Sequence, residues 1–215
     1  APTGETLENL AGSAGAPLLD WRAAAARTDV LAGPYVTVDP ARLGNRAAVE
    51  VPRNLTLGAD TTDGGLGITA DRSTVWVDRP TDPQVLTAIA GTGARRLLMY
   101  DDQLEDVPSD TNGTRNPFTL RLPGANPVNA VAIDRDLSDR LERPEGDPVL
   151  AAYQLLAEMA GEVVLPDGED SWEVTGRENQ AAVVAPSRRT LLSPEVVAAV
   201  GEGLRSSPVL RPMTV

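Results

Sequence analysis

The feature of this sequence that most constrains its fold is an apolar run followed by a helix-capping residue and a proline. The stretch VLAGPYVTVDPARL, residues 30–43, is the first example, with Asp39 and Pro40 directly after the apolar run. Aspartate accepts hydrogen bonds from the free amides of a helix N-terminus, and proline suits the first helical position. The pair of a capping residue and a proline recurs at Asp82-Pro83, Asp147-Pro148 and Ser193-Pro194. The pattern therefore predicts helices that begin at defined points after short buried strands.

The rest of the chain continues this alternation. We predict strands at 30–38, 74–78, 96–100, 118–122, 129–133 and 181–185, and helices at 17–27, from 40 onward, 83–90, 137–141, 148–163 and 195–204. Proline at position 52 is expected to interrupt the second helix, and 61–67, 101–116 and 166–180 are expected to be loops. Short, continuously apolar strands alternating with helices are typical of a mostly parallel sheet covered on both faces. The predicted fold class is therefore α/β, either doubly wound or an incomplete (β/α) barrel-like sheet.

The chain shows no internal repeat and no change of composition along its length. We expect residues 1–16 to be a linker with at most one helical turn, and residues 17–215 to form a single α/β domain. The first residue is not methionine, and no signal peptide or stretch of 18 apolar residues is visible. We interpret the sequence as a fragment of a longer exported chain.

Composition excludes several chemistries. All 19 basic residues are arginine, so a Schiff-base or phosphate-loop lysine is impossible. Histidine and cysteine are also absent, which excludes a Ser-His-Asp triad, a His-ligated metal, a thiol nucleophile and a disulfide. The net charge of −12 argues against binding to nucleic acid, which requires a basic surface. We expect no cofactor, no bound metal and no nucleic-acid partner.

Four predicted strands run into aspartate at their carboxyl ends, namely Asp39, Asp78, Asp101 and Asp134. Ligands of parallel α/β folds bind outside the carboxyl ends of the strands, so these side chains are candidates for one shared rim. Two such carboxylates could serve as the acid and base of a glycosidase, which needs no histidine. Oxygen ligands of this kind could also hold a hard cation. The competing interpretation is structural, because Asp39 and Asp134 can simply cap the helices that follow them.

Three further residues are candidates for ligand binding. Tyr35 lies in the first predicted strand, Trp172 in a polar loop, and Arg188 three residues after the last predicted strand. Tyrosine and tryptophan can stack on sugar rings, but packing is the alternative for Tyr35. A solvated loop position is the alternative for Arg188, since arginine is mostly exposed.

The order and spacing of five segments resemble a known family. They are VLAGPYVTVDPARL, VWVDRPTDPQVLTAIAGTGARRLLMY, NAVAIDRDLSDRL, AAYQLLAEMA and QAAVVAPSR. From about Leu18 to Val215 the chain is similar to large exported actinobacterial proteins of unknown function that are encoded beside the lipid II flippase. Members of this family distantly resemble the (β/α) barrels of polysaccharide deacetylases and family 57 glycoside hydrolases. The deacetylases use an Asp-His-His metal site, which this chain cannot form without histidine.

The resemblance implies an extracytoplasmic location, a parent chain that is anchored in the membrane outside this segment, and a link to the cell envelope. It implies no activity. We favour a non-catalytic envelope domain that binds glycan or a protein partner. The alternatives are a carbohydrate-active hydrolase that uses the strand-end carboxylates, and a structural or interaction module in which those carboxylates only cap helices.

Overall fold

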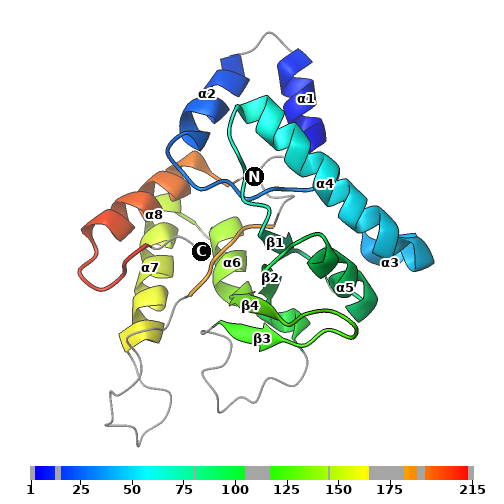
Figure 1. Ribbon diagram of the computed structural model, residues 1–215. Helices are drawn as coiled ribbons and strands as arrows, with labels where there is room; N and C mark the ends of the chain where they lie inside the picture. The colour runs from blue at the N-terminus through cyan, green and yellow to red at the C-terminus, as the bar shows by residue number, and fades with distance from the viewer. Residues whose placement is uncertain are drawn as a thin grey trace, which may run out of the picture. The chain divides into compact units, whose positions relative to one another are not determined.

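The structure of this protein is a computed structural model (Figure 1). It describes residues 3–12, 16–79, 81–104, 117–144, 146–164, 182–187 and 192–212. They belong to two compact units, and each is considered by itself. The first unit comprises residues 1–99 and 117–131, and the second comprises residues 100–116 and 132–215. The expectation of a single domain over 17–215 stays a prediction.

The first unit is organised around a four-stranded sheet with the strand order β1-β2-β4-β3. The strands of this sheet are β1 (Thr74–Val77), β2 (Arg96–Tyr100), β3 (Phe118–Leu120) and β4 (Val128–Ile133). The last residue of β2 and the last two residues of β4 are counted with the second unit. Strands β1 and β2 are parallel, with Val75 opposite Leu97, whereas β3 is antiparallel to β4. The three buried strands and the half-exposed hairpin arm lie where the apolar pattern predicted them.

Helix α5 (Pro83–Gly91) connects the parallel strands β1 and β2. It begins as predicted, with Pro83 in its first turn and Asp82 Oδ1 accepting a hydrogen bond from the amide of Gln84 at 2.7 Å. Val85, Leu86 and Ile89 are buried, because they recur at helical spacing on one face. This helix supplies the crossover that a parallel pair of strands requires.

Residues 4–12 form a helix of more than one turn, which corrects the expectation of at most one helical turn in this part of the chain. The segment 1–16 contains α1 (Gly4–Gly12) and the start of α2 (Ala16–Ala25). Leu7 of α1 is only 1% exposed and packs with Leu18, Ala25 and Leu66. An amphipathic turn that can bury a leucine gains enough from the removal of apolar surface to form a helix in a glycine-rich context.

The helical region after Asp39 is longer than predicted. It consists of α3 (Pro40–Leu43), the 3₁₀ turn η1 (Gly44–Arg46) and the 20-residue helix α4 (Ala47–Leu66), which continues through Pro52. The predictions of an interruption at Pro52 and of a loop at 61–67 were therefore wrong. The hydroxyls of Thr61 and Thr62 donate to carbonyls one turn earlier, and Gly67 ends the helix in a left-handed conformation.

Residues 30–38 do not form the predicted strand. A single parallel bridge joins Leu31 to Asp71. Beyond it, Pro34 has no amide proton to continue a ladder. The side chain of Asn54 instead takes the place of a partner strand: Val36 donates to its Oδ1 at 3.0 Å, and its Nδ2 donates to the carbonyl of Val36 at 2.8 Å. The backbone amide and carbonyl of Val36 are thus satisfied by a helix side chain rather than by a sheet.

The second unit contains the short turn η2 (Asp101–Gln103) and the helices α6 (Arg135–Glu142), α7 (Pro148–Val164) and α8 (Pro194–Ser206). Helices α7 and α8 begin at the predicted capping residues Asp147 and Ser193. The predicted strand at 181–185 is reduced, within its described residues, to one parallel bridge between Val183 and Ile133. Most of the predicted loops at 101–116 and 166–180 lies outside the described residues.

The predicted fold class is confirmed: the chain is α/β, with a mostly parallel sheet that is flanked by helices and does not close into a barrel. Among the helices of the described residues, none combines the length and the apolar character needed to cross a membrane.

Candidate functional site

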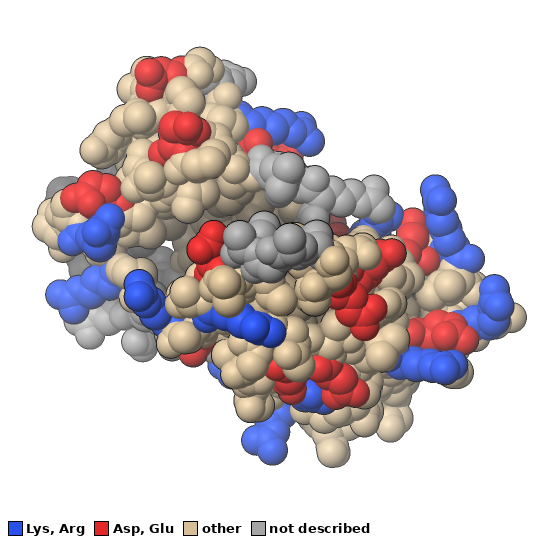
Figure 2. Space-filling view, turned by 90° about the horizontal axis from the view of Figure 1, so that it is seen from above, with Lys and Arg blue, Asp and Glu red and all other residues tan. Residues whose placement is uncertain are grey.

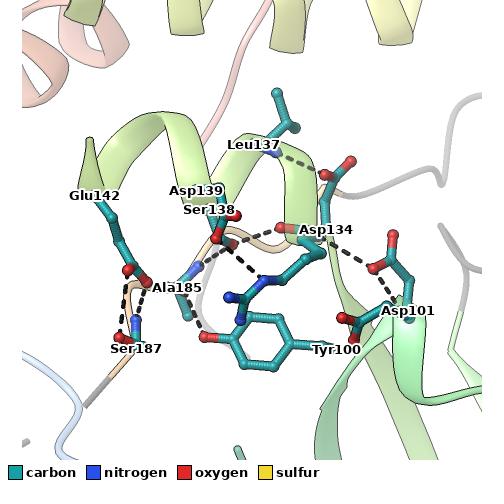
Figure 3. Close-up of polar contacts among 11 residues, drawn as sticks. Tyr100, Asp101, Asp134, Leu137, Ser138, Asp139, Glu142, Ala185 and Ser187 are labelled. Atoms are coloured by element: carbon teal, nitrogen blue, oxygen red, sulfur yellow. Dashed lines mark hydrogen bonds and ion pairs between the residues drawn. The ribbon is translucent and has the colours of Figure 1, made fainter. Parts of the chain in front are cut away.

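Two of the four candidate carboxylates lie together in the second unit, where β2 and β4 end (Figure 3). Asp101 follows Tyr100, the last residue of β2, and Asp134 follows the last residue of β4. Asp101 Oδ1 accepts hydrogen bonds from the backbone amides of Asp102 at 2.8 Å and Arg135 at 3.2 Å. The bond to Arg135 shows that these neighbouring strands end at the same edge, as the parallel pattern predicted.

The environment of Asp101 alters the protonation of its carboxyl group. Burial raises its pKa above the ordinary value, because it disfavours the charged form. The two backbone hydrogen bonds act in the opposite direction, whereas the negative charges of Asp134 and Asp102 raise the pKa further. Asp101 therefore keeps its proton to a higher pH than an exposed aspartate does.

Asp134 is the N-cap of α6. Its Oδ1 accepts a hydrogen bond from the amide of Leu137 at 2.8 Å. Its backbone amide donates to the carbonyl of Val183 at 2.9 Å, and its carbonyl accepts from Ser138 Oγ at 2.5 Å. The capping interpretation of Asp134 is thus confirmed, and the same residue holds the segment at Val183 against the end of β4.

Arg135 links three parts of this site. Its guanidinium carbon lies 4.6 Å from the centroid of the Tyr100 ring, a cation–π arrangement. Its Nε lies 3.1 Å from Asp139 Oδ1, one helical turn further along α6. The guanidinium therefore lies over the buried aromatic ring and is held there by Asp139, while the backbone amide of the same residue binds Asp101.

The segment 182–187 is attached to this edge by polar contacts. The Tyr100 hydroxyl donates to the carbonyl of Ala185 at 3.2 Å, and the amide of Ala185 donates to Ser138 Oγ at 3.2 Å. The amide of Ser187 donates to Glu142, whose other carboxylate oxygen lies 3.3 Å from Ser187 Oγ. These hydrogen bonds attach residues 185–187 to Tyr100 and to α6 (Figure 3).

The other two carboxylates belong to the first unit. Asp39 caps α3, with its Oδ1 accepting from the amide of Ala41 at 3.1 Å, and its Oδ2 accepts from Arg79 at 2.8 Å. Asp78 is half-buried directly after β1. Capping and an ion pair account for Asp39, and the convergence of all four carboxylates at one rim stays a prediction.

Of the three candidates for ligand binding, Tyr35 lies within the described residues. The hydroxyl of Tyr35 donates to Glu8 Oε2 at 2.7 Å, and this hydrogen bond raises the pKa of Tyr35. Tyr35 thus joins its loop to α1 within the first unit. Trp172 and Arg188 lie outside the described residues.

Sequence reasoning missed Tyr100, Arg135 and Glu142 as parts of the site. Tyr100 and Arg135 each stand beside a candidate aspartate in the sequence, which is the signal that could have identified them. Glu142 gave no such signal, since its contact to Ser187 depends on where the chain returns after a long intervening segment.

Charge on the surface is mixed. The face drawn in Figure 2 carries both arginine and acidic side chains. Within the described part of the chain, no three potential metal-ligating side chains lie close enough to hold a metal ion.

Comparison with known proteins shows that the fold of this chain is similar to part of a solved enzyme structure. No family model matches the chain, and no curated protein matches it significantly. Among solved structures it is similar to the crystal structure of a 4-alpha-glucanotransferase from Thermococcus litoralis, with a TM-score of 0.66 and 14% sequence identity. The match covers 99% of this chain and 32% of that one, so the chain spans about a third of the length of the glucanotransferase. The expected likeness to the fold of a carbohydrate-active enzyme is confirmed, and the likeness extends to the fold alone.

Proposed function

We propose that this chain is a non-catalytic domain that binds glycan at the edge formed by Asp101, Asp134 and Arg135. The observation that carries the proposal is the way in which the two carboxylates are used. Each has one oxygen bonded to backbone amides, Asp134 to Leu137 and Asp101 to Asp102 and Arg135. Carboxylates held in this way fix the shape of a site, whereas a catalytic pair must exchange protons or bonds with a substrate.

The chemistry of this edge suits a polyhydroxylated ligand. Carboxylate oxygens accept hydrogen bonds from sugar hydroxyls, and the guanidinium of Arg135 donates them. The contacts of Arg135 to Tyr100 and Asp139 reduce the freedom of its side chain before a ligand binds. Preorganisation of this kind lowers the entropic cost of binding.

We further propose an extracytoplasmic location in the bacterial cell envelope, within a longer parent chain of the exported actinobacterial type. The support for this part is the resemblance of segments such as VLAGPYVTVDPARL and NAVAIDRDLSDRL. A cell-wall glycan is then the favoured ligand, and a protein of the envelope is the alternative partner.

A binding screen tests the proposal. The chain is titrated with muropeptides and with neutral oligosaccharides, and binding is measured by calorimetry. We expect at least one glycan to bind, and we expect Asp101→Asn and Arg135→Ala to weaken that binding roughly tenfold, as the loss of a hydrogen bond to a charged group does.

Asp147→Asn is the matched control, because Asp147 caps α7 in the same unit and does not follow a strand. It should leave binding unchanged. Equal loss of binding in the Asp147 variant, or no binding of any glycan, would contradict the proposal.

A carbohydrate-active hydrolase is the second candidate, and one observation favours it. Asp101, whose pKa is raised, lies next to a second carboxyl group, that of Asp134, and the general acid of a glycosidase is likewise a carboxyl of raised pKa next to a second carboxyl group. Incubation with oligosaccharides, followed by chromatography of the products, separates the two functions. Cleavage or transfer that is abolished by Asp101→Asn would establish the hydrolase and overturn the non-catalytic proposal.

A further inference from the structure

A second feature of the second unit is a cavity of about 470 Å³ between α6 and α7. Its lining includes Arg140 and Arg143 from the end of α6 and Gln154 and Leu155 from α7. The cavity is at the opposite end of α6 from Asp134, the N-cap that belongs to the glycan-binding edge. Its volume is within the range typical of sites for small molecules.

The charges around this cavity are not balanced. Asp139 in its wall is paired with Arg135 at 3.1 Å, and Arg140 is paired with Glu158 of α7. Arg143 is exposed, and no acidic side chain among the described residues pairs with it. The lining therefore carries one uncompensated positive charge in a chain whose net charge is −12.

The donors are suited to an oxyanion. Arg140 lies in the last turn of α6 and Arg143 is the C-cap residue that follows it, and both side chains line the cavity. Guanidinium groups bind phosphate and carboxylate through paired hydrogen bonds, and the amide of Gln154 adds a further donor. Leu155, which is 3% exposed, provides an apolar floor for the body of a ligand.

We propose that this cavity binds a small molecule that carries a phosphate or carboxylate group. The oxyanion lies between Arg143 and Arg140, and the neutral part of the ligand packs over Leu155. In this arrangement Glu158 competes with the ligand for Arg140. The proposal is independent of glycan binding at the strand-end edge.

Because Glu158 competes with the ligand for Arg140, removal of Arg143 and removal of the Glu158 charge should change ligand affinity in opposite directions. Binding of glucose 1-phosphate, glucuronate and glucose to the full chain is measured by calorimetry at low salt. Arg143→Ala should weaken binding of the charged ligands roughly tenfold or more. Glu158→Gln should strengthen binding about two- to fivefold, because it frees a guanidinium from a surface ion pair.

The matched controls are Arg205→Ala and Glu202→Gln, which change an exposed ion pair of α8 in the same unit. Neither should alter binding. Circular dichroism verifies that each variant is folded. Equal binding of glucose and glucose 1-phosphate, unchanged binding in the Arg143 variant, or weaker binding in the Glu158 variant would each overturn the proposal. The separate titrations of glucose 1-phosphate and glucuronate show which oxyanion the cavity prefers.

Discussion

The Oδ1 atom of Asp101 lies 3.2 Å from the backbone nitrogen of Arg135 and accepts its hydrogen bond. This contact joins the end of β2 to the first residue of α6. It places a carboxyl of raised pKa directly beside a helix N-terminus, where partial positive charge favours an anion. Burial nevertheless dominates, since the pKa of Asp101 rises rather than falls.

The raised pKa predicts how stability depends on pH. Folding favours the protonated carboxyl of Asp101, so its contribution to stability is complete below the ordinary carboxyl pKa and is lost as the pH rises through the raised value. Asp101→Asn keeps an oxygen acceptor and removes the charge. We expect its Tm relative to the unaltered protein to be higher at about pH 7 than at about pH 3, measured by thermal unfolding.

The carbon NMR titration of the Asp101 carboxyl provides a direct check. Asp134→Asn should lower the pKa of Asp101, because it removes one of the negative charges that raise it. Asp147→Asn should not change that pKa. If the Tm difference between Asp101→Asn and the unaltered protein were constant over pH, or if the advantage of the variant were largest in acid, burial would not be what sets the pKa of Asp101.

The role of Asp134 as an N-cap predicts a loss of stability on truncation. Asp134→Ala should reduce the free energy of unfolding by about 1 kcal/mol, because the amide of Leu137 loses its acceptor. Asp134→Asn should retain most of the stability, since asparagine also caps helices. Urea unfolding followed by circular dichroism measures both. If the alanine and asparagine variants lose equal stability, the charge rather than the cap is important.

Local chemistry explains which parts of the fold were predictable. The apolar runs at Val75–Val77 and Leu97–Tyr100 form strands, and Asp82, Asp147 and Ser193 begin helices, because each signal acts within a few residues. The common edge of Asp101 and Asp134 also followed from the sequence, as neighbouring strands that end together place successive residues together.

Features that depend on distant partners were not predictable. Whether residues 30–38 pair as a strand depends on Asn54, a residue on another helix whose amide satisfies Val36. Helix α4 continues beyond Pro52, and residues of its later turns such as Ala59, Thr62 and Leu66 are buried, a tertiary contribution that intrinsic helix propensity does not include. The stacking of Arg135 on Tyr100 likewise depends on the direction in which α6 leaves β4.

A substitution at Gly58 of α4 tests whether the segment of residues 33–35 packs on this helix. A Cβ atom at position 58 would overlap with backbone atoms of Gly33, Pro34 and Tyr35. Backbone cannot rotate away as a side chain can, so Gly58→Ala should destabilise the protein by about 2 kcal/mol or more. The measurement is the free energy of unfolding in urea.

Gly64 of the same helix is the matched control, because a Cβ there meets nothing within 4 Å. Gly64→Ala should stabilise the protein by up to about 1 kcal/mol, the difference in helix propensity between the two residues. Two variants of one helix with the same change thus have opposite expected signs. Stabilisation by Gly58→Ala would show that the 33–35 segment does not pack on α4.

The side chain of Asn54 makes the hydrogen bonds that a partner strand would make to Val36. Its removal should show how much these hydrogen bonds contribute to the free energy of unfolding. Asn54→Ala leaves the amide and carbonyl of Val36 without their partners at 3.0 and 2.8 Å, and should cost about 1–3 kcal/mol of unfolding free energy. Asn54→Asp keeps the acceptor for the amide but places a carboxylate oxygen against the carbonyl, so it should also destabilise the protein.

Asn45→Ala is the control, because Asn45 is at an exposed position of η1, and it should change stability by less than about 0.5 kcal/mol. Hydrogen exchange of the Val36 amide locates the effect, since this proton should exchange faster in both Asn54 variants than in the Asn45 variant. Unchanged protection of that amide in Asn54→Ala would mean that another group satisfies it and that residues 30–38 do not depend on the helix side chain.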